Sequence, residues 1–230
     1  MSVPSKPLAP MALTEQLPRR LINLLLGLIG YGLSISLMLQ AHLGNQPWDV
    51  FHQGLSLLTG LSVGLVLIIV GAAVLLCWIP LRQRPGIGTV ANIIVLGIVV
   101  DVANQLIPAP SQLAVRITYL LVGILLCGAA SGLYIGANLG PGPRDGLMTG
   151  LTRRFGWSLR GWRTTIEISV VAVGFLLGGE IGLGTIAYAL AIGPLAQFFI
   201  PILAVRPRAT QGVKVDPDPA PEPVALQPTA

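Results

Sequence analysis

The stretch LGNQPWDVFHQGLSLLTGLS, residues 43–62, recurs as LGPGPRDGLMTGLTRRFGWS, residues 139–158. The two copies align without gaps at a single offset of 96 residues, which pairs Asp49 with Asp145. Matches among abundant apolar residues carry little information, but here prolines, an aspartate and several glycines match as well. The sequence therefore predicts an internal duplication.

The composition around the repeat indicates a membrane protein. Of 230 residues, 53% are hydrophobic and 10% are charged, whereas soluble domains are about 25% charged. About 20 apolar residues cross a hydrocarbon core of about 30 Å. Six apolar stretches of roughly this length follow one another at residues 20–42, 62–81, 88–107, 113–137, 161–177 and 184–202. We expect an all-α membrane protein with six transmembrane helices, whose net charge of +5 reflects topology and not binding to nucleic acid.

The duplication divides these helices into two equal units. Repeat 1 is residues 19–108 and repeat 2 is residues 109–205, each with three crossings and a short extra half-helix after its first crossing. Because three is an odd number, repeat 2 must insert with the opposite orientation, so the two units form inverted repeats. Residues 1–18 and 206–230 are Pro-rich and are predicted to be disordered cytoplasmic tails.

The positions of the basic residues predict the orientation. Loops rich in Lys and Arg stay in the cytoplasm. With a cytoplasmic N-terminus and six crossings, Arg116 alone among the 14 Lys and Arg residues falls outside. We therefore expect a multi-pass protein of the cell membrane with both termini in the cytoplasm.

Residues of the same type mark both ends of each half-helix. Proline suits a first helical turn, aspartate accepts from unpaired backbone N–H groups there, glycine permits a left-handed stop, and serine caps the next helix. In the two copies these are Pro47 and Pro143, Asp49 and Asp145, Gly60 and Gly156, and Ser62 and Ser158.

Two placements of the half-helices are consistent with their amphipathic pattern. In the first, each helix lies in the membrane interface with its apolar face in lipid. In the second, each loop dips inward and the N-terminal ends of the two half-helices face each other near the midplane. Their positive dipole ends would then form a pseudo-symmetric site for a solute or ion.

Ionisable and polar groups at membrane depth are candidate functional sites because their insertion is costly. Glu167 follows Arg163 by one helical turn, so a local ion pair is the simpler interpretation. The candidate substrate-binding residues are Pro47, Asp49, Pro143, Asp145, Asp101, Asn92 and Glu167. The sequence contains no compact metal motif and no catalytic signature, so we expect no catalytic residues, no cofactor and no enzymatic activity.

Glycines at every fourth position indicate close helix packing. Gly128, Gly132, Gly136 and Gly140 form one such series, and Gly174, Gly178 and Gly182 form another. Such series allow close approach of helix backbones within a tightly packed monomer or across a homodimer face.

The repeated segments, together with IPLRQRPGIGT at residues 79–89, resemble the YczE/YyaS/YitT family of bacterial integral membrane proteins, and its YczE-type members in particular. The resemblance covers about residues 20–205. It implies a multi-pass protein of the bacterial plasma membrane and brings no established substrate.

Two functions are compatible with this pattern. A transporter or exporter of a small solute or ion would use the two half-helices as paired broken elements at one site, with the lipid bilayer as its surroundings. A non-transporting accessory or regulatory protein would instead use its cytoplasmic surface as a contact.

Overall fold

The computed structural model describes residues 14–205, and in this part of the chain every regular element is an α-helix. The tails expected to be disordered lie largely outside the described residues. The helices, in chain order, are α1 (Leu17–Ala41), α2 (Pro47–Thr59), α3 (Val63–Trp78), α4 (Ile87–Leu106), α5 (Leu113–Gly136), α6 (Pro143–Phe155), α7 (Leu159–Leu176) and α8 (Leu183–Leu203). The prediction of an all-α protein is confirmed.

Length and hydropathy identify α1, α4, α5 and α8 as helices able to cross a membrane. A fifth crossing is formed if α2 and α3, which are bent by 112° at their junction, count as one broken span. The helix α7 carries three charged residues, Arg160, Arg163 and Glu167, in its 18 residues. The membrane character is thus confirmed, while the full set of six crossings stays a prediction.

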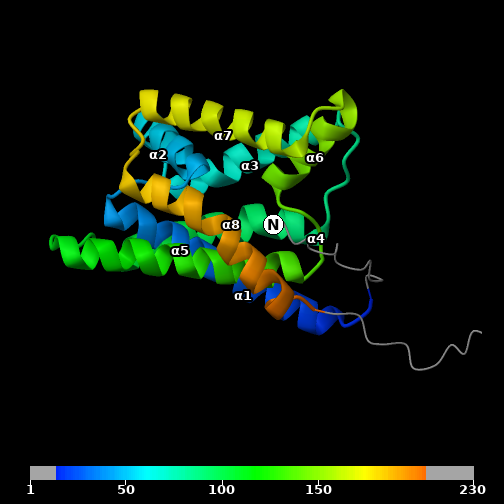
Figure 1. Ribbon diagram of the computed structural model, residues 1–230, viewed down its shortest axis with the longest axis horizontal. Coiled ribbons are helices and arrows are strands. Elements are labelled where there is room, and N and C mark those ends of the chain that lie inside the picture. The colour runs from blue at the N-terminus through cyan, green and yellow to red at the C-terminus, as the bar shows by residue number, and fades with distance from the viewer. Residues whose placement is uncertain (1–13, 206–230) are drawn as a thin grey trace, which may run out of the picture.

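Figure 1 shows α1 and α5 lying side by side along one edge of the molecule, with α7 along the opposite edge and α2 and α3 next to it. The helices α1 and α5 are antiparallel, because Arg20 near the start of α1 bonds to the end of α5. Small residues permit this contact: a Cβ on Gly27 would lie 2.6 Å from the backbone nitrogen of Tyr134. On the other side of the pair, Gly123 lies against Ser34, whose hydroxyl donates to the Gly123 carbonyl over 2.7 Å.

The half-helices begin and end at the predicted residues. Proline occupies the first turn of both α2 and α6, and Gly60 and Gly156 end them with φ of 72° in each case. Ser62 and Ser158 then cap α3 and α7 by accepting from the backbone N–H groups of Leu65 and Gly161, respectively. These boundaries are confirmed.

The capping role predicted for Asp49 is wrong. The N-cap of α2 is Gln46, without a side-chain cap, and the Asp49 carboxylate bonds instead to the side chains of Gln46 and His52. The aspartate is therefore part of a buried polar cluster and not a helix cap.

The start of each last helix docks on the glycine turn of the other unit. The Gly88 N–H donates to the Leu139 carbonyl over 2.9 Å, and the Gly184 N–H donates to the Leu43 carbonyl over 2.8 Å. The two contacts are related by the same offset of 96 residues, applied in opposite directions. The hydroxyl of Thr89 adds a bond of 2.7 Å to the Pro141 carbonyl.

The two units differ in how their third and fourth helices pack. The helix α3 lies closely on α4, because Gly64 faces Gly97 and Gly71 faces Ile93. The helix α7 packs instead on α2 and α6, and α8 packs on α5. Gly193, the equivalent of Gly97, has no atom of the described chain within 4 Å of its Cβ position. The space between α7 and α8 is therefore more open than that between α3 and α4.

The glycine series pack within the chain. Gly128, Gly132 and Gly136 lie against Leu195, Phe199 and Ala204, the last just beyond the end of α8. They therefore serve the contact between α5 and α8, and a homodimer stays a prediction.

Candidate functional site

A cavity of about 200 Å³ lies where the N-terminal ends of α2 and α6 meet. Seven of the eight helices contribute to its wall, α3 being the exception among the described residues. The predicted site residues in this wall are Pro47, Pro143, Asp145, Asn92 and Glu167. The structure thus brings together, at one cavity, five predicted site residues that belong to four different helices.

The contact between the two half-helices is made by equivalent residues. Trp48 and Arg144 each precede the repeated aspartate, and the guanidinium carbon of Arg144 lies 4.9 Å from the centre of the Trp48 ring. A cation over an indole face is an attractive arrangement. The contact of these two residues brings the first turns of α2 and α6 next to each other.

Asp49 lies behind the wall of the cavity, almost completely buried. Its carboxylate accepts from the side-chain amide of Gln46 and lies 3.2 Å from Nδ1 of His52. Arg144 of the other half-helix completes its surroundings at 3.8 Å. The carboxylate is therefore held by three partners.

Asp145, the equivalent of Asp49, has a different environment. Its side chain is exposed to the cavity, and within residues 14–205 it has no ion-pair partner. The duplication therefore supplies one carboxylate with three close partners and one that forms no ion pair in the described chain, although Arg144 and Arg163 lie near enough to act on it electrostatically.

Glu167 and Arg163 form the ion pair expected from their spacing, with Nε and Oε1 2.9 Å apart. Both residues line the cavity from α7. Arg163 and Arg144 both count as cytoplasmic in the charge pattern, and their side chains line the cavity.

Asp101 lies apart from the cavity, at the junction of α3 and α4. Its carboxylate accepts from the Ser62 hydroxyl over 2.6 Å and from the Gly64 N–H over 2.7 Å. The aspartate thus ties the beginning of α3 to α4, and the described structure gives it no place in the cavity wall.

Aromatic side chains in the wall were not among the predicted site residues. They are Tyr31, Trp48, Tyr134 and Tyr188. Neither the Nε1 of Trp48 nor the hydroxyl of Tyr134 has a hydrogen-bond partner in the described chain. The repeat gave no signal for the tyrosines, because their equivalents are Cys127, Met38 and Asn92.

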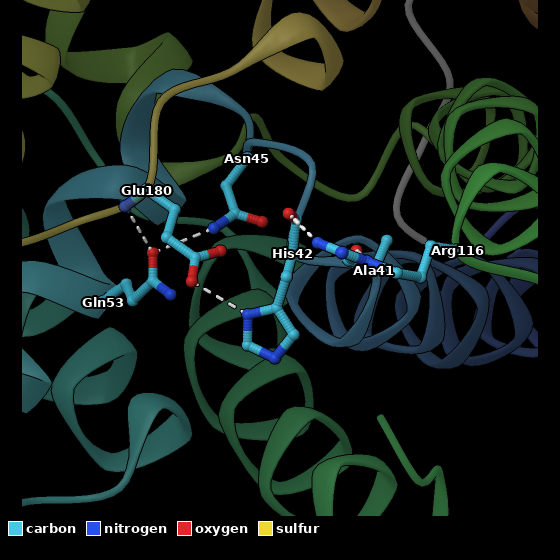
Figure 2. A network of polar contacts seen from close by, with 6 residues as sticks. All are labelled: Ala41, His42, Asn45, Gln53, Arg116 and Glu180. Carbon is cyan, nitrogen blue, oxygen red and sulfur yellow. Dashed lines mark hydrogen bonds and ion pairs between the residues drawn. The ribbon is translucent and has the colours of Figure 1, made fainter. Parts of the chain in front are cut away.

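A second polar network, separate from the cavity, joins the end of α1 to the loop before α8 (Figure 2). Nδ1 of His42 lies 2.8 Å from the Glu180 carboxylate. The side-chain carbonyl of Gln53 accepts from the Asn45 amide and from the Glu180 N–H, over 2.9 and 2.7 Å. Arg116 donates to the carbonyls of Ala41 and of His42. His42 and His52 thus have separate carboxylate partners and do not converge on one site.

Comparison with known proteins gives relatives over most of the chain. The sequence signature of the family of unknown function DUF6198 matches residues 18–201. An uncharacterized protein of Haemophilus influenzae is 41% identical over 184 residues, which cover 80% of this chain and 84% of that protein. The uncharacterized membrane protein YczE of Bacillus subtilis is 35% identical over 76% of this chain and 81% of its own length.

A more distant relative is the uncharacterized protein YyaS of Bacillus subtilis, 26% identical over 77% of this chain and 90% of its own length. No solved structure matches the chain. The chain belongs to the family of unknown function DUF6198, which agrees with the likeness of its repeated segments to YczE and YyaS.

Proposed function

We propose that this protein transports a small solute across the bacterial plasma membrane, and that the cavity between α2 and α6 is its binding site. The observation that carries the proposal is the contact of Trp48 with Arg144, which brings two half-helix ends to one cavity. Broken helices that meet at a pseudo-symmetric site are the usual construction of solute sites in secondary transporters. The proposal includes no catalysis.

The proposal includes six crossings arranged as two inverted repeats. It is supported by contacts that recur with the two halves exchanged. Arg20 donates to Ala137, and its equivalent Arg116 donates to Ala41, the equivalent of Ala137. Such reciprocal bonds are expected when two copies are related by a twofold axis in the membrane plane.

Unequal packing of the two halves supports a mechanism of alternating access. The helices α3 and α4 are closely packed, whereas Gly193 on α8, the equivalent of Gly97, lines the cavity and has no atom of the described chain near its Cβ position. In inverted-repeat transporters, access alternates as one repeat rocks against the other around a fixed site. We propose that a second state has α7 closed on α8 and α3 separated from α4.

In the proposed orientation both termini are cytoplasmic, and α6 lies on the cytoplasmic side. The cavity wall includes the start of α6 and the first half of α7, through Asp145, Arg163 and Glu167. The described conformation would then be the one that opens toward the cytoplasm.

Cysteine accessibility in intact cells tests this function. Single cysteines are placed through residues 44–52 and 140–148 in a background with Cys77→Ser and Cys127→Ala, and are labelled with an impermeant maleimide from each side. Transport predicts that positions in both stretches react from both sides, and that Asp145→Asn changes the ratio. Labelling of each stretch from its own side alone, unchanged by the substitution, would favour an accessory protein.

A further inference from the structure

We propose that the cavity binds a small zwitterion, a solute that carries both a protonated amine and a carboxylate, with an apolar side chain of amino-acid size. This inference rests on the proposed function, because it names the class of solute for the same site. The argument depends on two features of the cavity: one carboxylate without an ion pair in the described chain, and a charged donor, Arg144, beside two buried groups without a hydrogen-bond partner there.

The amine is assigned to Asp145. The other carboxylates near the cavity are already compensated, Glu167 by Arg163 at 2.9 Å and Asp49 by its three partners. An unpaired carboxylate within a protein of the membrane is costly, and a bound ammonium group would offset that cost. Asp145 is therefore the position at which a positive group on the solute gains most.

The carboxylate is assigned to Arg144 and to two polar groups without partners. The Nε1 of Trp48 and the hydroxyl of Tyr134 have no hydrogen-bond partner in the described chain, although the two residues are only 7% and 5% exposed. Buried polar groups without partners are costly, and the indole N–H acts only as a donor. Both atoms are closed off from the cavity in the described conformation, whereas the Arg144 guanidinium lines it. Binding that opens the wall toward the two groups would let them join Arg144 as donors to an acidic oxygen.

The donors and the acceptor lie within reach of one small molecule. A Cβ on Gly142 would lie 2.5 Å from the Tyr134 hydroxyl and 3.2 Å from a carboxylate oxygen of Asp145, so the two groups flank the same glycine. The rest of the wall is largely aliphatic: it includes Leu96, Ile135, Met148, Ile192 and Ala196. A solute with neighbouring amine and carboxylate and one apolar side chain matches this distribution.

Binding to the purified full-length protein in lipid nanodiscs tests the inference. The probes are L-leucine, L-leucine methyl ester, which lacks the acidic group, and N-acetyl-L-leucine, which lacks the basic group. We expect leucine to bind at least about tenfold more tightly than either derivative, since each loses one charged contact worth about 1.4 kcal/mol or more. Equal binding of leucine and either derivative, or binding of none of the three, would overturn the inference.

Variants test which residue binds the amine of the solute and which binds its carboxylate. Asp145→Asn should remove the preference for leucine over N-acetyl-leucine, and Trp48→Phe should reduce the preference for leucine over its ester. Asp101→Asn is the matched control, because it changes an acidic residue outside the cavity and should leave both preferences intact. If Asp145→Asn does not fold, Asp145→Glu replaces it and should shift affinity by several-fold. An Asp145 variant that keeps the wild-type preferences and affinity would refute the assignment.

Measurements of solute uptake distinguish a failure of this inference from a failure of the proposed function. Leucine binding in nanodiscs without leucine uptake into proteoliposomes would refute transport of this solute class and leave the zwitterion site standing. Uptake of the ester or the N-acetyl derivative at the rate of leucine would leave transport standing and refute the zwitterion.

Discussion

Arg20 and Arg116, which are 96 residues apart, each bind the end of the helix to which the other belongs. Nε of Arg20 donates to the Ala137 carbonyl after α5 over 2.9 Å, and Nε of Arg116 donates to the Ala41 carbonyl at the end of α1 over 2.7 Å. Each cation thus meets the negative end of a helix, where backbone carbonyls lack partners. The two bonds hold the pair of α1 and α5 together at both of its ends.

Replacing these arginines should destabilise the protein unequally. Arg20 is completely buried, whereas Arg116 is partly exposed. Charged hydrogen bonds contribute about 1.5–3 kcal/mol, and the loss is larger where water cannot replace the donor. We expect Arg20→Met to lower the melting temperature in detergent more than Arg116→Met. Equal losses would show that the burial of Arg20 has no energetic role.

The glycines at the docked helix starts should be intolerant of a side chain. A Cβ on Gly184 would lie 2.5 Å from the Gly44 carbonyl oxygen, and one on Gly88 would lie 3.1 Å from the Leu139 carbonyl oxygen. Because both neighbours are backbone atoms, we expect Gly184→Ala to destabilise strongly and Gly88→Ala to a lesser degree.

Gly193→Ala is the matched control for this series. Its Cβ position is open, and alanine favours a helix over glycine by about 1 kcal/mol. Thermal melting should therefore show a small gain in stability. A loss as large as that of Gly184→Ala would contradict the packing at all three positions.

Local signals in the sequence predicted the boundaries of the half-helices. The other features depend on contacts between residues far apart in the chain, which residue type alone does not predict. Pro47, Gly60 and Ser62 act on their own stretch of backbone, so their roles follow from residue type. Arg20 was counted only as a topology signal, because its partner at Ala137 depends on how α1 and α5 pack.

The candidate site was predicted in part for the same reason. The repeat singled out the PxD turns, which do lie at the cavity. The wall tyrosines have unrelated residues at the equivalent positions, so no repeat signal marks them. Asp101 was singled out by its charge, but only the tertiary structure places Ser62 and Gly64 beside it.

The half-helix α6 packs on α3, and the half-helix α2 packs on α7. In these two equivalent interfaces the large and the small side chain are on opposite partners. Gly146 on α6 faces Trp78 on α3, whereas Val50 on α2 faces Gly174 on α7, and these residues are equivalent in the repeat. We expect Gly146→Val to clash with the indole and to destabilise by about 1–3 kcal/mol. Trp78→Gly should cost about 3–5 kcal/mol through the cavity that it creates.

The double variant Gly146→Val/Trp78→Gly reproduces the combination of the other interface. Its loss of stability, measured by thermal melting, should be smaller than the sum of the single losses, with a coupling of about 0.5–3 kcal/mol. Additive losses would show that the two residues do not share one packing site.

The turns that follow the two half-helices should lie on opposite sides of the membrane. Leu61 after α2 and Trp157 after α6 are 39% and 50% exposed, so neither position is packed inside the chain and a cysteine there disturbs no core contact. Because the proposed units carry an odd number of crossings, an impermeant maleimide should label Leu61→Cys in intact cells but Trp157→Cys only after permeabilisation. The exposed native thiol at Cys77 is first replaced by serine, so that any labelling belongs to the introduced residue. Reaction of both cysteines in intact cells would place the two turns in one compartment, and the inverted arrangement on which the cavity's proposed role depends would then be wrong.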